Sequence, residues 1–310
     1  EMSATIKQLT REEDFDIVQI EDSFMALYLD DVTPKGGCRT VLSLHDINFH
    51  KIKRIQQLEP KLARKLRLWL HSTFLNKWEP AYAGKFDGCV TMSELDRERL
   101  LEKNPAINAR SIPNGVDTKS YQFLPAPLPE DSLKQSLLYI GNMDYRPNQD
   151  AIIWFCREIL PVVRKTYPQI ELWIVGKNTS DDIYRLADDH THVTGMVPEV
   201  SPYYRNTNIS IVPLRAGGGT RLKILESMAL GRPVVSTTIG CEGIEASDGE
   251  EIFIADSPSA FAEKIDRLIQ NQETYNQIAF KARKFVENTY DWDIIVRDLE
   301  LFYRELLQKD

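Results

Sequence analysis

The stretch Pro213-Leu-Arg-Ala-Gly-Gly-Gly-Thr-Arg-Leu-Lys-Ile-Leu-Glu226, which continues through Met228-Ala-Leu-Gly-Arg-Pro233, carries the clearest structural pattern in the chain. Apolar residues at 209–214 predict a buried strand, and the pattern that starts near Thr220 predicts a helix that stops at Gly231. Between them, Gly217, Gly218 and Gly219 let the backbone turn tightly and approach a ligand closely. Glycine runs are more often plain linkers. Here another strand follows at 233–237, and open α/β sheets bind ligands at the carboxyl ends of their strands, which favours a binding loop.

The predicted helix begins with positive charge. Arg221 and Lys223 lie in its first turn, where the free N–H groups and the helix dipole already attract anions. Thr220, Lys223 and Glu226 share one face. The packing face is expected to consist of Leu222, Leu225 and Ala229. A cationic first turn with a carboxylate one turn deeper suits a diphosphate linked to a hydroxyl-bearing sugar, so the pattern predicts a nucleotide-diphosphate site. The alternative, a simple turn with solvated charges, stays open.

Composition narrows the class of protein. The chain has 310 residues, 42% apolar and 27% charged, and its 38 bases and 46 acids give a net charge of −8, which argues against a generic nucleic-acid binder. No apolar run approaches the roughly 18–20 residues that span a bilayer, and nothing resembles a signal peptide, so we expect a cytoplasmic protein. The four cysteines are scattered and the five histidines lack metal spacing. We therefore expect buried free thiols and no metal.

Positive charge is concentrated between Lys51 and Lys85. This segment has nine basic residues against Glu59 and Glu79, interleaved with leucines, Trp69 and Phe74. A basic amphipathic helix can lie on an anionic membrane surface, which predicts peripheral membrane contact. The other interpretation is a surface helix whose apolar stripe packs on its own domain. Both remain open from the sequence.

Short apolar runs alternate with helical patterns along the chain, which predicts parallel sheets covered by helices. A proline-rich patch at 125–129 makes the segment 125–135 the best linker candidate. We therefore expect a first domain at 1–124, a second at 136–290 and a closing helix at 291–310 that reaches back toward the first. The expected strands lie at 15–20, 40–44, 88–91, 137–140, 170–175, 192–194, 209–214 and 233–237, and the expected helices at 93–101, 150–165, 181–187, 220–231 and 294–307.

Several motifs together resemble the family 4 (group 1) retaining glycosyltransferases of the GT-B fold. They are Leu44-His-Asp46, Val90-Thr-Met-Ser93, Ile112-Pro-Asn-Gly-Val-Asp117, Gly141-Asn-Met-Asp-Tyr-Arg-Pro-Asn148, Val175-Gly-Lys177, Val193-Thr-Gly-Met-Val197 and the 213–233 block. The resemblance implies two Rossmann-like domains with parallel sheets that face each other across a cleft. It also implies that the first domain is incomplete, because the family normally opens with further elements before a strand such as 15–20.

The resemblance also implies roles for individual residues. Glu226 would hydrogen-bond the donor ribose, and Lys223 and Arg221 would contact the diphosphate. The backbone around Met196 and Val197 would read the base. His45 would face the donor sugar from the first domain. The structural alternatives are a core histidine at 45 and an exposed helix carboxylate at 226.

The chain departs from the family pattern in the binding motifs. The first glutamate of the family's paired motif falls on Gly218, so the backbone amides of Gly218 and Gly219 would replace its contact. The family's usual Arg and Lys after the first donor-domain strand fall on Asn142 and Pro147. Arg146 is the nearest substitute. Asn142 and Arg146 are therefore further candidates for the donor site.

The function implied is transfer of a sugar from a nucleotide diphosphate sugar to a sugar or lipid-linked acceptor, with retention of configuration and without a metal. Such an enzyme would serve polysaccharide or glycoconjugate synthesis. Because the opening elements are absent, we expect the chain to bind a nucleotide diphosphate but to transfer sugar poorly. The alternatives are a non-catalytic nucleotide-sugar binding module or inactive fragment, and a GT-B epimerase or phosphorylase.

Overall fold

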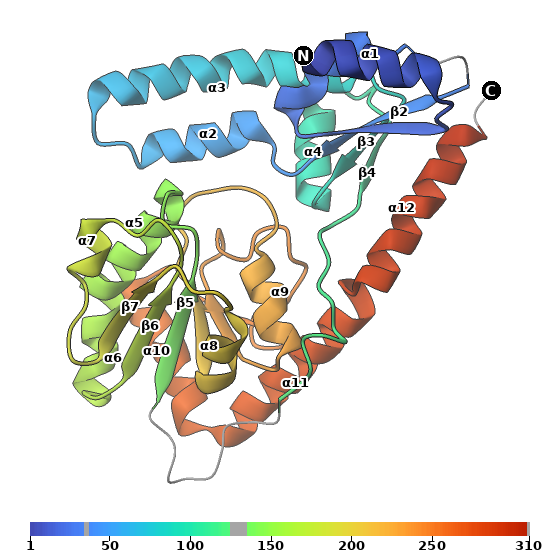
Figure 1. Cartoon of the computed structure of the whole chain (residues 1–310). Helices are drawn as coiled ribbons and strands as arrows, with labels where there is room; N and C mark the ends of the chain where they lie inside the picture. Colours follow the sequence, from blue (N-terminus) through green and yellow to red (C-terminus); the bar gives the residue numbers. More distant parts are fainter. Residues whose placement is uncertain (34–36, 125–134, 309–310) are drawn as a thin grey trace. The chain divides into compact units, whose positions relative to one another are not determined.

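The computed structural model describes residues 1–33, 37–124 and 135–308, which form two compact units (Figure 1). Unit 1 comprises Glu1–Asn114, Gly218–Thr220 and Asp293–Asp310. Unit 2 comprises Gly115–Gly217 and Arg221–Trp292. The linker expected at 125–135 lies, except for its last residue, outside the described residues. None of the described helices is long and apolar enough to cross a membrane.

Unit 1 is built on a parallel four-stranded sheet. Its strands are β1 (Ile17–Glu21), β2 (Arg39–Leu44), β3 (Gly88–Thr91) and β4 (Ala109–Ser111), in the order β1-β2-β3-β4. In the central pair, Val41 lies opposite Gly88 and Leu44 opposite Thr91. β3 is buried along its whole length, as expected for a parallel strand covered on both faces.

Helices cover both faces of this sheet. They are α1 (Met2–Glu12), the 3₁₀ helix η1 (Ser23–Asp31), α2 (Asn48–Gln57), α3 (Leu62–Ala83), α4 (Glu94–Lys103) and α12 (Trp292–Leu307). Leu42 and Leu44 pack with Leu75 of α3 and Leu100 of α4. Side chains alternate along a strand, so Val41 points to the other face, where it packs with residues of α12. Those residues are Ile295, Phe302 and Leu306.

The basic segment between Lys51 and Lys85 forms two helices, α2 and α3, separated at Leu58–Lys61, which includes Pro60. Leu75 of α3 is buried in the unit 1 core, but an apolar stripe on the same helix faces solvent. Leu62 is 83% exposed, Leu66 58% and Leu70 56%, and Trp69 and Phe74 are also exposed. Leu68 and Trp78 of the same helix pack on the unit 1 core, so α3 packs on its own domain with one part of its apolar side chains and exposes the other.

Unit 2 contains a parallel six-stranded sheet in the order β10-β9-β8-β5-β6-β7. The strands are β5 (Ser136–Ile140), β6 (Glu171–Val175), β7 (Thr191–Gly195), β8 (Ile209–Val212), β9 (Val234–Ser236) and β10 (Phe253–Ile254). The chain runs outward from β5 to β7 and then returns to place β8 on the other side of β5. Ligands of open α/β sheets bind at such a reversal, beyond the carboxyl ends of the strands.

Helices of unit 2 enclose a single large core that includes Tyr139, Phe155, Ile174 and Phe261. They are α5 (Arg146–Trp154), a π-helical turn η3 (Phe155–Ile159), α6 (Leu160–Thr166), α7 (Asp181–Tyr184), α8 (Ser201–Asn206), α9 (Leu222–Ala229), α10 (Pro258–Gln270) and α11 (Gln272–Thr289). The α/β class and the two parallel sheets predicted from the sequence are confirmed.

The structure differs in two details from the helix predicted at 220–231. Helix α9 begins at Leu222 with Arg221 as its N-cap, two residues later than predicted. Leu222 is exposed, so it is not part of the packing face, which instead includes Ile224, Leu225, Met228 and Ala229. The four cysteines are free, as expected, but only Cys89 and Cys241 are fully buried.

Candidate functional site

The carboxyl ends of β5, β6 and β7 are joined through glycines. The N–H of Gly141 donates to the carbonyl of Val175 at 3.0 Å, and the N–H of Gly176 donates to the carbonyl of Gly195 at 3.2 Å. A Cβ at Gly176 would lie 1.7 Å from the carbonyl oxygen of Gly141, so no larger residue fits there. These contacts hold three strand ends in one backbone platform at the edge where ligands of such sheets bind.

Lys223 faces this platform from the first turn of α9. Its Nζ lies 3.3 Å from Oδ1 of Asn148 and 4.7 Å from the ring centroid of Tyr139. A Cβ at Gly141 would lie 3.2 Å from the same Nζ. Burial, followed by the nearby charge of Arg221, lowers the pKa of Lys223 to about 7. The amine is thus a desolvated donor beside the loop that follows β5, where an anion would stabilise its charged form.

Glu226, one turn deeper on α9, is held by two tyrosines. The hydroxyl of Tyr204 donates to Oε2 at 2.8 Å, and the hydroxyl of Tyr121 donates to Oε1 at 3.2 Å. Burial, and after it the charge of Glu226, raises the pKa of Tyr121 to about 12 and that of Tyr204 well above its ordinary value. Both hydroxyls therefore keep their protons and donate to the carboxylate. A carboxylate offers about four acceptor positions, so Glu226 can still accept hydrogen bonds from a ligand.

Arg283 of α11 fixes the segment that carries Tyr121. Its guanidinium donates to the backbone carbonyls of Thr118, Tyr121 and Ala229. The last of these carbonyls belongs to the end of α9, so one arginine ties the Tyr121 segment to the helix that carries Glu226. Sequence reasoning missed Tyr121, Tyr204 and Arg283, because each lies far along the chain from the motif that it supports.

The other unit 2 candidates lie around the same strand ends. Gly217 has a φ of +122°, and a Cβ there would lie 2.9 Å from Nη2 of Arg221. Asn142 accepts hydrogen bonds at Oδ1 from the N–H of Asp144 and the amide of Asn178, so it braces the loop after β5. Arg146 is the first residue of α5.

The segment expected to read the base follows β7. Met196 is 79% exposed, whereas Val197 packs against a cluster that contains Tyr204. Tyr204 of the same cluster also contacts Glu226. Unit 2 thus brings Gly217 close to Arg221, and Asn148 contacts both Lys223 and Asn142. Val197 lies against the hydrophobic cluster that contains Tyr204, the partner of Glu226.

His45, Gly218, Gly219 and Thr220 fall in unit 1. His45 follows β2; its side chain is 48% exposed, and its Nε2 lies 2.9 Å from Oε2 of Glu21. It is therefore no core histidine. A Cβ added at Gly218 would lie 2.5 Å from Oδ1 of Asp46, and one added at Gly219 would lie 2.8 Å from the same atom. Side chains at these two positions would therefore collide with that carboxylate. The hydroxyl of Thr220 donates to the carbonyl of Met92 at 3.2 Å.

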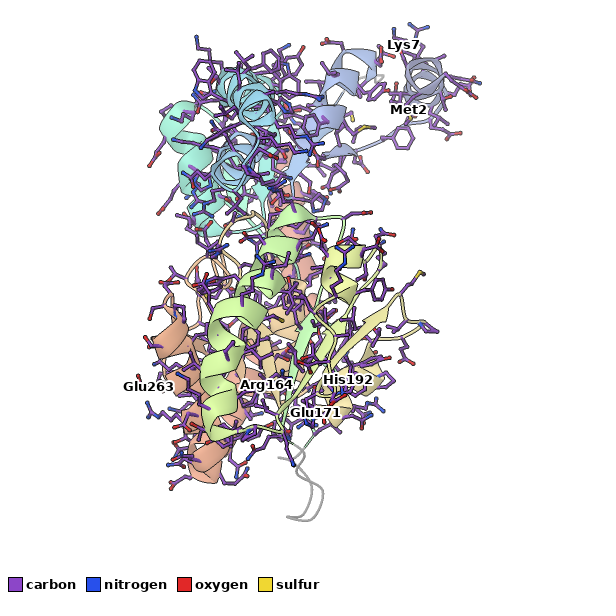
Figure 2. The ribbon with its side chains drawn as sticks, turned by 90° about the vertical axis from the view of Figure 1, so that its left-hand side faces the viewer. Met2, Lys7, Arg164, Glu171, His192 and Glu263 are labelled. Carbon is purple, nitrogen blue, oxygen red and sulfur yellow. The ribbon has the colours of Figure 1, made fainter. Side chains whose placement is uncertain are left out.

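Two histidines that sequence analysis excluded as metal ligands meet one carboxylate. His190 lies 3.1 Å from Glu171, and His192 also contacts Glu171 (Figure 2). The ring of His192 in addition contacts that of Trp173 in a tilted arrangement, with ring centroids 4.3 Å apart. The described residues contain no cluster of three or more histidine, cysteine or acidic side chains that could hold a metal ion.

Family models match the chain in two successive parts. The model described as Glycosyltransferase Family 4 matches residues 1–120, and the model described as Glycosyl transferases group 1 matches residues 134–271. Together they cover most of both units.

Curated relatives are similar over part of their length. An uncharacterized 44.6 kDa protein in the cps region of Klebsiella pneumoniae is 31% identical over 50% of this chain and 42% of its own. A phosphatidyl-myo-inositol mannosyltransferase of Mycobacterium leprae is 23% identical over 77% of this chain and 64% of its own. The capsular polysaccharide biosynthesis glycosyltransferase CapM of Staphylococcus aureus is 27% identical over 71% of this chain and 62% of its own. The chain thus spans less than two thirds of each of these relatives.

Solved structures share the fold. A sucrose-phosphate synthase from Thermosynechococcus elongatus superposes with a TM-score of 0.76 at 19% identity, over 100% of this chain and 78% of its own. HepE of Anabaena in complex with UDP gives a TM-score of 0.72 at 16% identity, over 98% of this chain and 82% of its own.

Proposed function

Because the chain belongs to the family 4 (group 1) glycosyltransferases, we propose that it transfers a sugar from a nucleotide diphosphate sugar to an acceptor hydroxyl with retention of the anomeric configuration. The reaction serves polysaccharide or glycoconjugate synthesis. This is supported by the similarity to CapM, a capsular polysaccharide biosynthesis glycosyltransferase, and to the phosphatidyl-myo-inositol mannosyltransferase. A nucleotide diphosphate donor is supported by the UDP complex of HepE, which shares the fold.

The observation that carries this proposal is the geometry of α9. Lys223 and Glu226 are one turn apart on one helix, and Lys223 lies beside the loop that follows β5. Glu226 is oriented by two tyrosine hydroxyls and keeps acceptor capacity for the hydroxyls of a ribose. In a nucleotide the diphosphate is attached directly to the ribose. Two side chains one helical turn apart can therefore contact both groups at once. Val197 and the neighbouring backbone then contact the base.

The chemical demand of the reaction is stabilisation of the departing diphosphate. Arg221 and Lys223 offer two cationic groups beside the N-terminus of α9, and charge-assisted hydrogen bonds contribute roughly 1.5–3 kcal/mol each. Such preorganised charge stabilises the leaving group without reorganisation during the reaction. We therefore propose that these residues neutralise the diphosphate and that the reaction needs no metal.

His45 acts from unit 1 in this proposal, where it contacts the donor sugar. Its exposed ring and its pairing with Glu21 leave it available to a ligand and fix its orientation. We also propose peripheral membrane contact through the segment between Lys51 and Lys85. The two acidic residues of this segment, Glu59 and Glu79, are buried, so the charge it presents to solvent is basic. That charge lies beside the exposed apolar stripe of α3, a combination typical of helices at anionic membrane surfaces.

The test is direct. Purified protein is screened by calorimetry against UDP, GDP and ADP sugars, and the donor that binds is incubated with mixtures of sugar and lipid-linked acceptors. We expect release of nucleoside diphosphate only with an acceptor present, and NMR of the product should show the donor's anomeric configuration. Glu263→Ala, which removes an exposed carboxylate on α10, serves as the matched control for variants of Glu226. Donor binding without release under any condition would instead support a non-catalytic binding module.

A further inference from the structure

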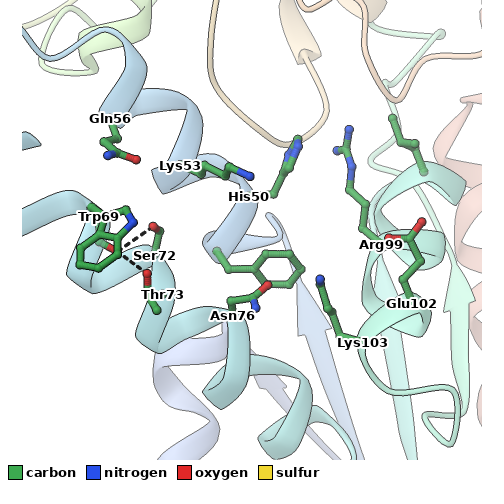
Figure 3. A pocket seen from close by; sticks show the side chains of 12 residues that line it. His50, Lys53, Gln56, Trp69, Ser72, Thr73, Asn76, Arg99, Glu102 and Lys103 are labelled. Atoms are coloured by element: carbon green, nitrogen blue, oxygen red, sulfur yellow. Dashed lines mark hydrogen bonds between the residues drawn. The ribbon is translucent and has the colours of Figure 1, made fainter. Parts of the chain in front are cut away.

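Unit 1 contains a pocket of about 570 Å³ between α2, α3 and α4 (Figure 3). Lys53 lies on α2, Trp69 and Asn76 on α3, and Arg99 and Lys103 on α4. This volume lies within the range of small-molecule sites, which is about 300–1,000 Å³. None of the residues considered so far as donor-site candidates lines it. We call it the α2–α4 pocket.

The pocket is basic. Lys53, Arg99 and Lys103 carry positive charge, and Glu102 is the one carboxylate among the lining residues. Arg99 is paired with Asp96 at 3.2 Å. Lys53 and Lys103 are exposed, and neither forms an ion pair with a residue in the described part of the chain. Their amines point into the space between α2 and α4 (Figure 3), and lysine is a common phosphate ligand. Two lysines without an ion pair in one pocket, in a protein of net charge −8, favour an anionic occupant.

The rim of the pocket is continuous with the apolar stripe of α3. Trp69 lines the pocket and also belongs to the stripe formed by Leu62, Leu66, Leu70 and Phe74. These positions recur every three or four residues, so they share one face of the helix. Isolated exposed apolar residues are ordinary, but a contiguous exposed face marks an interaction site. A ligand that fills the pocket and continues along this rim must join an anionic group to hydrocarbon.

Polar groups of the pocket suit the part of such a ligand that carries hydroxyls. Gln56 and Asn76 present side-chain amides to the pocket, and Trp69 offers a ring face (Figure 3). The hydroxyls of Ser72 and Thr73 donate to the carbonyl of Trp69, at 3.0 and 2.8 Å. Their lone pairs stay available, so the α3 wall offers both donors and acceptors.

We propose that the α2–α4 pocket binds the phosphate or diphosphate group of a lipid-linked acceptor, with Lys53 and Lys103 as its anion ligands and Trp69 at the start of the lipid path. This deepens the proposed function, on which it rests, because it names the acceptor class and the residues that select it. The hydrocarbon chain continues along the exposed stripe of α3 toward the bilayer.

The test uses the full chain and three probes: farnesyl diphosphate, inorganic diphosphate and farnesol. The double variant Lys53→Ala/Lys103→Ala is compared with Lys65→Ala/Lys77→Ala, which removes the same charge from exposed positions of α3 outside the pocket lining. By calorimetry, we expect the pocket variant to weaken farnesyl diphosphate binding by roughly tenfold or more, since each lysine contributes a charge-assisted contact. The control should stay within about twofold of the parent, because surface charges that do not contact the ligand contribute little.

The other probes distinguish the sources of affinity. Farnesyl diphosphate should bind at least about tenfold more tightly than inorganic diphosphate or farnesol, since it alone satisfies both the lysines and the apolar rim. Trp69→Ala should weaken farnesyl diphosphate but not inorganic diphosphate. Equal losses in the pocket and control variants, or equal affinity for all three probes, would overturn the proposal. Binding of nucleotide sugars, measured in parallel, tests the proposed function separately, because neither variant alters unit 2.

Discussion

The hydroxyl of Tyr204 donates a 2.8 Å hydrogen bond to Oε2 of Glu226, which joins α8 to the helix at the centre of the candidate donor site. Tyr204 is almost fully buried, and burial raises its pKa well above its ordinary value, so the hydroxyl keeps its proton. The carbonyl of Lys223, at 3.4 Å, is a second and more distant acceptor for it. This contact changes what mutation of Glu226 is expected to do. An exposed helix carboxylate, the alternative that the sequence leaves open for Glu226, could be removed with little effect on stability. In the structure, the same change removes the shorter of the two hydrogen bonds of a buried hydroxyl, which keeps only the 3.4 Å contact to the carbonyl of Lys223. We therefore expect a loss of stability of about 1 kcal/mol.

We predict that Glu226→Ala weakens binding of the preferred nucleoside diphosphate by roughly ten- to a hundredfold, the loss expected for hydrogen bonds to a charged group. The decisive comparison is a nucleotide that lacks both ribose hydroxyls. If Glu226 binds the ribose, calorimetry should show the variant and the parent binding this analogue with equal affinity. Glu263→Ala should bind both nucleotides like the parent. Tyr204→Phe should lower affinity less than Glu226→Ala, because Tyr121 still orients the carboxylate.

Nucleotide binding should take up a proton at Lys223. Burial lowers the pKa of this amine from 10.5 to about 7, so at pH 8 it is mostly neutral in the empty site. A bound diphosphate favours the charged form and raises the pKa again, so binding at pH 8 should take up about one proton. Affinity should accordingly fall as pH rises above 7. Calorimetry in two buffers with different ionisation enthalpies measures the uptake. Lys223→Met should abolish the uptake, and an unchanged proton balance in that variant would assign the proton to another group.

His45→Ala should reduce turnover far more than donor affinity, because the proposed contact forms with the sugar at the moment of reaction. Loss of one preorganised polar contact of this kind is expected to lower turnover by a factor on the order of 10². Glu21→Gln should give a smaller loss of the same kind, since the carboxylate orients the ring from 2.9 Å. Steady-state kinetics with calorimetry separate turnover from binding. His71→Ala, an exposed histidine on α3, is the control. Equal turnover in the two histidine variants would remove His45 from the mechanism.

The apolar stripe of α3 should bind anionic membranes. Sedimentation with vesicles of phosphatidylcholine and phosphatidylglycerol at low salt should pellet the parent, and added salt should release it, because each basic residue near the surface contributes about 1 kcal/mol. Leu66→Ser/Leu70→Ser should reduce pelleting. Phe280→Ser, at an exposed apolar position of α11 in unit 2, should not. Pelleting that depends on Phe280 and not on the α3 leucines would locate the membrane contact elsewhere.

Local periodicity determined part of the elements of this protein; the helices α1, α8, α10 and α11 were not predicted. The predicted strands at 40–44 and 88–91 and the helix capped by Ser93 agree with β2, β3 and α4 to within two residues, because alternation and capping depend on neighbouring residues. The motif from 213 to 233 likewise places Lys223 and Glu226 one turn apart on a helix, since that spacing is a property of the helix itself. The family resemblance rests on the same local signals.

What surrounds those side chains was decided by the tertiary structure. Tyr121 lies 105 residues before Glu226, and Arg283 of α11 holds the segment of Tyr121 in place. The low pKa of Lys223 likewise depends on desolvation by neighbours such as Tyr139 and Asn148, which no pattern within α9 predicts. The exposure of the α3 stripe is a further case, because a stripe of leucines has the same period whether it packs on its own domain or faces solvent. Periodicity encodes which side of an element is apolar, whereas burial, charge state and hydrogen-bond partners arise only when distant segments pack together.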